Sequence, residues 1–282
     1  MAHPDPPPFW TALVDDAAIF PPGDADVLDA ANAYLERDEA LVGSFVLRDT
    51  DVPRLAVAPG ARFPVSVVIT GGAGQLAGPA GYCAKQGLTL AGLEIALRDP
   101  DDLPGNARRV VAAVDAARSE GVLDDDVPVY VELPQGEPTP GWLAAADEVA
   151  AAELRLKFRT GGLEEHLFPT AHALAGWVDA ALDRETPFKC TAGLHNAVRH
   201  TGEDGFEHHG FLNVLVATRR AFDGAAADDV VAILENRDAA ALAADARDAD
   251  LAGARRWFIS FGSCSVREPL DDLLTLGLLE NT

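Results

Sequence analysis

Lysine is scarce in this chain: only Lys85, Lys157 and Lys189 occur among 22 basic residues. Acidic residues outnumber basic ones 45 to 22, which gives a formal net charge of −23. A surface of this charge repels phosphate backbones and anionic lipid headgroups, so we expect no nucleic-acid partner and no membrane partner. A general shortage of lysine removes exposed lysines first. The two that remain inside apolar segments, Lys157 and Lys189, are therefore candidates for chemistry.

The chain also has few cysteines and no long apolar run. The three cysteines, Cys83, Cys190 and Cys264, are odd in number and far apart, which argues against a disulfide framework and a zinc knuckle. No run approaches about 18 apolar residues without a charge, so no transmembrane helix is predicted. The first residues, MAHPDPPPFW, lack the basic and apolar regions of a secretory signal. We therefore expect a reducing, cytoplasmic setting.

Short β-rich segments alternate with Ala-rich amphipathic segments along the chain. Strands are predicted at 15–20, 41–47, 63–70, 90–97, 127–134, 154–160, 187–193 and 257–262. Helical patterns lie between them, for example at 107–121, 141–152 and 171–183. This alternation predicts right-handed βαβ units, and eight strands in 282 residues predict a single-domain α/β (β/α)8 TIM barrel. A short Pro-rich lead-in is expected at 1–12.

A doubly wound open sheet is the alternative architecture. Its dinucleotide-binding form needs a G-x-G-x-x-G run after the first strand, and none occurs there. The Gly-rich run TGGAGQLAG at 70–78 lacks the lysine and the spacing of a phosphate loop. The closed barrel is therefore favoured.

Alternate residues of a barrel strand face the interior and the surrounding helices. In the segment 154–160 the apolar alternate residues pack on helices, so Lys157 and Arg159 face inward. Active sites of this fold lie at the carboxyl ends of the strands. The same alternation gives a polar inward set at that end: Arg48, Glu94, Glu132, Lys189, Thr191, Gly193, His195 and Ser260.

Three motifs lie at the ends of the last three predicted strands: LKFRTGG at 156–162, FKCTAGL at 188–194 and FGSCSV at 261–266. They resemble motifs of the deoxyribose-phosphate aldolase family, which are class I aldolases. The resemblance implies a Schiff-base lysine at Lys157, a second lysine at Lys189 and a phosphate loop after the last strand. The sequence departs from that family where Ala96 replaces the strand-four aspartate, with Glu94 two residues earlier.

The patterns KxRTGG, FKxTAGLH and HGFLN also resemble a group of bacterial and archaeal barrel proteins. This resemblance extends into the segment 207–215, which is unlike the aldolase family. It implies the barrel fold and assigns no activity.

The favoured hypothesis is a Schiff-base lyase that acts on a small carbonyl or phosphorylated substrate without a cofactor. A free lysine has a pKa of about 10.4, and burial or a neighbouring cation lowers it. We expect Arg159 and Lys189 to lower the pKa of Lys157 in this way. Glu132, Glu94 and His195 are then the predicted proton-transfer groups. The predicted anion-binding set is Arg159, Arg48, Thr191, Gly161, Gly162, Gly193, Ser260, Ser263 and Ser265.

Two other functions stay open. A metal-dependent hydrolase or isomerase would use Glu94, Glu132, His195 and either His208 or His209 as ligands. A non-catalytic binder of an anionic small molecule would hold it with Arg48, Arg159, Lys189 and His195. In every case the expected partner is a small molecule carrying phosphate or carboxylate, and homodimer formation is open. The pair His208–His209 is expected to open a helix, and the segment 196–209 is either a lid over the site or an ordinary surface loop.

Overall fold

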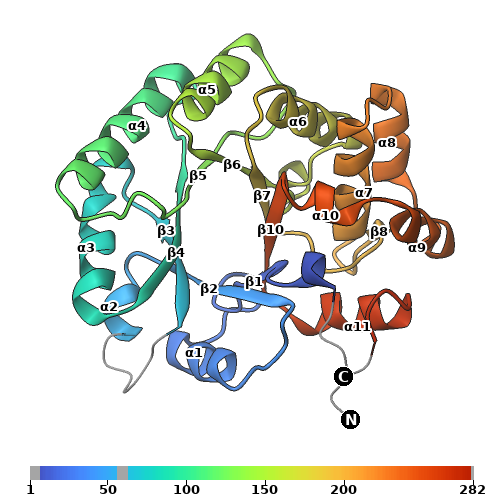
Figure 1. Cartoon of the computed structure of the whole chain (residues 1–282), viewed down its shortest axis with the longest axis horizontal. Helices are drawn as coiled ribbons and strands as arrows, with labels where there is room; N and C mark the ends of the chain where they lie inside the picture. The colour runs from blue at the N-terminus through green and yellow to red at the C-terminus, as the bar shows by residue number, and fades with distance from the viewer. Residues whose placement is uncertain (1–6, 56–62, 281–282) are drawn as a thin grey trace.

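The computed structural model describes residues 7–55 and 63–280, and within them eight parallel strands close into a barrel. Neighbouring strands around the barrel follow the order β1-β10-β7-β6-β5-β4-β3-β2, which returns to β1. Helices form a ring outside the strands (Figure 1). The barrel strands are β1 (Val14–Asp16), β2 (Val42–Arg48), β3 (Pro64–Ile69), β4 (Thr89–Ala96), β5 (Val129–Glu132), β6 (Arg155–Arg159), β7 (Phe188–Thr191) and β10 (Phe258–Ser263).

The connections between the strands are mostly helical. A short antiparallel pair of strands, β8 (His200–Thr201) and β9 (Glu207–His208), lies in the connection after β7. The helices are α1 (Val27–Leu35), α2 (Val52–Leu55), α3 (Ala77–Gln86), α4 (Leu103–Ser119), α5 (Pro140–Ala151), α6 (Ala171–Asp183), α7 (Phe211–Phe222), α8 (Ala227–Glu235), α9 (Ala239–Asp248), α10 (Leu251–Ala254) and α11 (Arg267–Thr275).

The predicted TIM barrel is confirmed, and a closed sheet rules out the doubly wound alternative. The Pro-rich lead-in forms a 3-10 turn at Pro8–Trp10, and its residues 1–6 lie outside the described part. None of the helices in residues 7–55 and 63–280 has the length and the hydrophobicity of a membrane span.

Side-chain alternation sorts the strands as expected, with apolar residues against the helices. Phe158 of β6 is buried, and its ring lies 5.5 Å from that of Trp177 in α6 and 4.9 Å from that of Phe188 in β7. Burial of such large rings between the strands and the helices stabilises the packing of the helix ring on the barrel. The alternate positions of the same strands are therefore free to present polar groups to the barrel interior.

The first strand differs from its predicted position. The sequence pattern predicts it at 15–20, but β1 ends at Asp16, and the chain then turns through Ala17 and Phe20. Ile19 is buried in the core although it lies after the strand. An apolar residue buried in a turn therefore resembles a strand residue in the sequence pattern.

Candidate active site

Two buried lysines lie side by side inside the barrel. Lys157 of β6 and Lys189 of β7 are paired in the parallel register of these strands. Their exposed fractions are only 3% and 1%. Two ammonium groups at this depth are costly unless carboxylates pair with them.

Glu94 of β4 supplies a carboxylate to both lysines. Its Oε2 lies 2.6 Å from Nζ of Lys157, and its Oε1 lies 2.7 Å from Nζ of Lys189. A bidentate carboxylate with a lysine at each oxygen holds both amines in fixed positions. The inward orientation predicted for Glu94, Lys157 and Lys189 is confirmed.

Glu132 and Arg159 complete the cluster toward solvent. Oε2 of Glu132 lies 3.0 Å from Nζ of Lys157, and Nε of Arg159 donates a hydrogen bond of 2.9 Å to Oε1 of Glu132. The side chain of Arg159 is 37% exposed, whereas that of Lys157 is 4% exposed. Solvent therefore meets Arg159 first, and the lysine lies behind the Glu132–Arg159 pair.

Asp15 of β1 is a site residue that the sequence analysis missed. Its Oδ2 accepts hydrogen bonds from Lys189 at 2.7 Å and from Ser260 of β10 at 2.6 Å. Its Oδ1 accepts the hydroxyl proton of Ser44 at 2.7 Å. With Asp15 included, the cluster pairs three carboxylates with the three cations Lys157, Lys189 and Arg159, so its charges balance.

The expected direction of the Lys157 pKa is wrong. Burial alone would lower the pKa of this amine, but the carboxylates of Glu132 and Glu94 outweigh burial and raise the pKa. The pKa of Lys189 is also raised, because Asp15 and Glu94 outweigh burial. We expected each lysine to destabilise the charged form of the other. Instead, the carboxylate of Glu94 lies between the two ammonium groups and stabilises both.

The pKa values of the two glutamates are lowered, opposite to the shifts of the lysines. Burial would raise the pKa of Glu94, but Lys157 and Lys189 outweigh it and lower the pKa to about 2. The pKa of Glu132 is lowered by Lys157 and Arg159, which likewise outweigh its burial. Both glutamates are therefore ionised at neutral pH and form ion pairs with the Lys157 ammonium group.

The predicted glycine donors pack against each other instead of surrounding open space. A Cβ on Gly161 would lie 2.7 Å from Cα of Gly193, and one on Gly193 would lie 2.7 Å from the carbonyl oxygen of Thr160. Gly193 also has a φ of +76°, which favours glycine. A Cβ on Gly162 would overlap the side chain of Leu167. The chain after β6 and the chain after β7 approach each other so closely that a side chain would not fit at these positions, which accounts for the glycines. Their role in anion binding stays a prediction.

The serines of β10 and of the turn that follows it form hydrogen bonds within the fold. Ser263 Oγ donates to the carbonyl oxygen of Ser265 at 2.6 Å, and Ser265 Oγ accepts from the backbone N–H of Glu268 at 3.5 Å. Ser260, which is predicted to bind an anion, donates to Asp15. Thr191 pairs in register with Arg159 of β6 and Gly262 of β10. Each of the three serine hydroxyls therefore has a hydrogen-bond partner within the fold.

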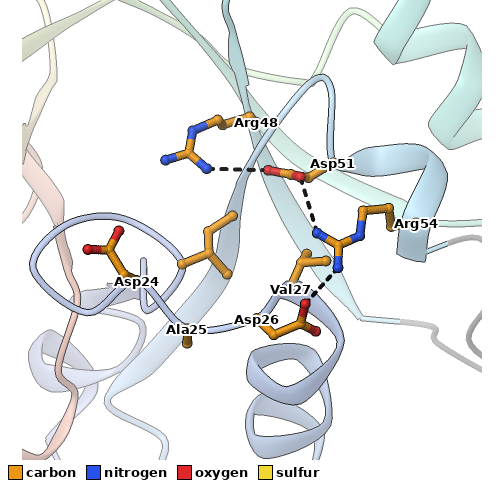
Figure 2. A pocket seen from close by; sticks show the side chains of 8 residues that line it. Asp24, Ala25, Asp26, Val27, Arg48, Asp51 and Arg54 are labelled. Carbon is orange, nitrogen blue, oxygen red and sulfur yellow. Dashed lines mark hydrogen bonds and ion pairs between the residues drawn. The ribbon is translucent and has the colours of Figure 1, made fainter.

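Arg48 lies in a separate polar pocket at the end of β2. Figure 2 shows Arg48 directed toward Asp51, with Arg54 joining Asp51 to Asp26. The pocket has a volume of about 290 Å³. Its lining includes Asp24, and the guanidinium of Arg48 also lies 4.6 Å from the ring centre of Phe20.

His195 and His209 belong to different surroundings from the lysines. His195 Nδ1 lies 2.8 Å from Oε2 of Glu268. His209 is fully buried between the carbonyl oxygen of Pro169, 2.8 Å from Nε2, and Nη1 of Arg199, 3.1 Å from Nδ1. Burial lowers the pKa of His209 to about 4. Within residues 7–55 and 63–280 no group of three or more His, Cys, Asp or Glu residues is placed to hold a metal ion, so the predicted ligand set is not brought together.

The segment 196–209 forms the β8–β9 hairpin, and its predicted action as a lid stays a prediction. Phe206 and His208 pack on Phe168, with ring centres 5.4 and 4.6 Å apart. The expected helix start at His208–His209 is wrong, because His208 belongs to β9 and α7 begins at Phe211 after the N-cap Gly210. The hairpin therefore covers the loop that follows β6.

The barrel is similar to the solved structure of deoxyribose phosphate aldolase from Aeropyrum pernix, a protein described as having a unique tetrameric structure. The TM-score is 0.56 at 14% sequence identity, over 95% of this chain and 92% of that one. No family model and no curated protein sequence matches this chain. At this identity the likeness establishes only the class of fold, a TIM barrel. The resemblance through the KxRTGG, FKxTAGLH and HGFLN motifs stays a prediction.

Proposed function

We propose that this chain is a Schiff-base-forming lyase of the class I aldolase type, with Lys157 as its nucleophile. The observation that carries the proposal is the position of the Lys157 amine, within 3.0 Å of both Glu94 and Glu132. Similarity of the barrel to an aldolase structure adds support for this class of reaction.

Proton transfer makes the neutral amine available. The ammonium group of Lys157 gives a proton to Glu132 or Glu94 over a single hydrogen bond, and the cluster keeps the same total charge. The neutral amine then attacks a carbonyl carbon to give a carbinolamine. The carbinolamine oxygen receives one proton from the protonated glutamate and a second from the carbinolamine nitrogen by way of the same carboxylate, and it leaves as water while the nitrogen becomes the iminium. Every proton needed for imine formation is thus held within this cluster.

The raised pKa of Lys157 is compatible with this chemistry, because a protonated imine carries its positive charge on the same nitrogen. Carboxylates that stabilise the ammonium form also stabilise the iminium ion that replaces it. The neutral amine is rare at rest, but its charged product is favoured. An iminium adjacent to the bond that breaks accepts the electron pair released in carbon–carbon cleavage.

Arg159 gives the proposal a substrate class. Its guanidinium lies at the solvent side of the cluster, held at Nε by Glu132, and it is partly exposed. A planar guanidinium in this position is suited to a carboxylate or phosphate. The proposed substrate is therefore a small carbonyl compound that carries an anionic group.

Borohydride trapping tests the proposal with charge-matched variants. The protein is mixed with a panel of small aldehydes, ketones and sugar phosphates, reduced with borohydride, and weighed intact. Lys157→Arg keeps a cation between Glu94 and Glu132 but forms no imine. Lys189→Arg is the matched variant on the neighbouring strand.

We expect a single adduct in the wild type and in Lys189→Arg, and none in Lys157→Arg. An adduct that persists in Lys157→Arg would show that another amine reacts and would overturn the assignment. Binding of an anionic carbonyl compound without any trapped adduct would favour the non-catalytic binder.

A further inference from the structure

A second group of reactive side chains lies at the same end of the barrel as the lysine cluster. Cys264 directly follows β10, His195 lies in the segment after β7, and Glu268 is the second residue of α11. The carboxyl ends of β7 and β10, which are neighbours in the barrel, therefore bring a thiol, an imidazole and a carboxylate together.

The contacts among these three groups give each a distinct role. Nδ1 of His195 lies 2.8 Å from Oε2 of Glu268. Sγ of Cys264 lies 3.7 Å from Nε2 of His195 and 3.9 Å from Nδ1. Because Nδ1 is paired with the carboxylate, Nε2 is the nitrogen left to accept a proton. Sγ is almost equally far from both nitrogens and so lies beside the imidazole ring, from where a small shift of the thiol brings it to the Nε2 lone pair. A nucleophile, a base and a group that orients the base are the parts of a general-base nucleophilic site.

Exposure distinguishes Cys264 from the other two cysteines. Cys83 and Cys190 are fully buried in the apolar core, whereas Cys264 is only partly buried. The side chain of His195 is 18% exposed and that of Glu268 is 50% exposed. A reagent can therefore reach this thiol from the solvent side of the barrel mouth.

We propose that Cys264, His195 and Glu268 form a second nucleophilic site, which takes an activated acyl group from an ester or thioester. Sγ of Cys264 bonds to the acyl carbon as its proton passes to Nε2 of His195. The bond between the acyl carbon and its alcohol or thiol breaks, and the leaving group takes the proton from His195. The product is a thioester on Cys264, and Glu268 is a positioning residue that acts through the imidazole.

The electrostatics of Cys264 agree with a thiol that needs a base. Burial and the nearby carboxylate of Glu268 raise its pKa, so the thiol is protonated at rest. The backbone N–H groups of Gly23 and Cys264 oppose this shift, which gives the sulfur donors that favour its negative form. The attack therefore depends on proton transfer to His195 rather than on a standing thiolate.

The test uses p-nitrophenyl acetate as the acyl donor and peptide mapping to locate the acetyl group. The reference is the same thiol in the chain unfolded by denaturant, where the three groups are separated. We expect Cys264 to react at least about tenfold faster in the folded protein, because general-base catalysis outweighs partial burial. Cys83 and Cys190 serve as internal controls and remain unlabelled in the folded protein.

Variants separate catalysis from mere exposure. His195→Ala should slow acetylation of Cys264 roughly 100-fold, and added imidazole should restore part of the rate. Glu268→Gln should slow it roughly two- to fivefold, with Glu268→Asp recovering part of the loss, because the pair is partly exposed. Glu148→Gln, at an exposed ion pair with Arg108 outside both proposed sites, should leave acetylation unchanged.

Three results would overturn the proposal. The first is a folded-state rate at or below that of the unfolded thiol. The second is acetylation of Cys264 that is insensitive to His195→Ala. The third is a loss in His195→Ala that imidazole does not restore while the circular dichroism spectrum is unchanged, since the imidazole would then have no role as a base.

Discussion

Replacement of Glu94 by Gln tests the electrostatics of the lysine cluster. The substitution keeps the shape of the side chain and removes the only carboxylate that contacts both Lys157 and Lys189 within the described residues. The pKa of Glu94 is lowered from 4.5 to about 2. Because Glu94 is 1% exposed, solvent does not screen its interactions, and this difference corresponds to about 3 kcal/mol of folding free energy.

The sign of the pH dependence follows from that lowered pKa. Since the folded protein holds the ionised form more strongly than the unfolded chain, the contribution of Glu94 is complete above its unfolded pKa of 4.5. It is lost as pH falls from there through about 2. We therefore expect Glu94→Gln to cost about 3 kcal/mol at neutral pH and roughly half of that near pH 3.

Urea unfolding of the wild type and the variant at both pH values measures this difference. Glu148→Gln is the matched control, because Glu148 forms an exposed ion pair of 2.7 Å with Arg108. The control should cost less than about 1 kcal/mol. A cost for Glu94→Gln equal to that of the control, or one that does not shrink at low pH, would refute the assigned network.

Three further substitutions have defined outcomes in the same unfolding assay. Gly193→Ala should cost at least about 2 kcal/mol more than Gly121→Ala, because both positions have positive φ but only Gly193 meets backbone atoms within 3 Å; equal costs would contradict the packing. Asp15→Asn should lower the free energy of unfolding by about 3 kcal/mol, because it leaves Lys189 with one carboxylate. Ser260→Ala, which removes a neutral hydrogen bond to the same aspartate, should lower it by about 1 kcal/mol. Equal losses would count against the ion pair. Because burial keeps the His209 imidazole neutral, the wild type should lose about 3 kcal/mol of stability as pH falls from 6.5 to about 4. The variant His209→Gln should not show this loss. Parallel curves of stability against pH for the two proteins would contradict the assignment to His209.

The inward positions of the site could be predicted from the sequence because strand alternation depends only on local pattern. Leu156 and Phe158 are apolar and pack outside the barrel, so Lys157 between them must face inside, as found. The same local argument gave Glu94 and Glu132. Asp15 was missed because the buried turn residue Ile19 extended the apolar pattern past the true end of β1.

The sign of the lysine pKa shifts could not be predicted from the same pattern. Alternation shows that Lys157 and Lys189 face inward on adjacent strands, which suggests repulsion. It does not show that Glu94, from a strand two places away from β6, reaches between them. Contacts across a barrel depend on strand stagger and side-chain length, and neither is encoded in a local period.

The glycines after β6 and β7 illustrate a different difficulty. A glycine beside an anion and a glycine beside another backbone look alike in a sequence, because both need the missing Cβ. Only the short distance that would separate a Cβ on Gly161 from the backbone of Gly193 assigns close packing here.

The most direct test of the central claim is to map the borohydride-trapped adduct of the wild-type chain by peptide mass spectrometry. The chain offers three lysines, and exposed Lys85 reports ordinary surface reactivity. The account predicts the adduct on Lys157, although this amine is far less exposed than Lys85. An adduct on Lys85 or Lys189 without one on Lys157 would contradict it.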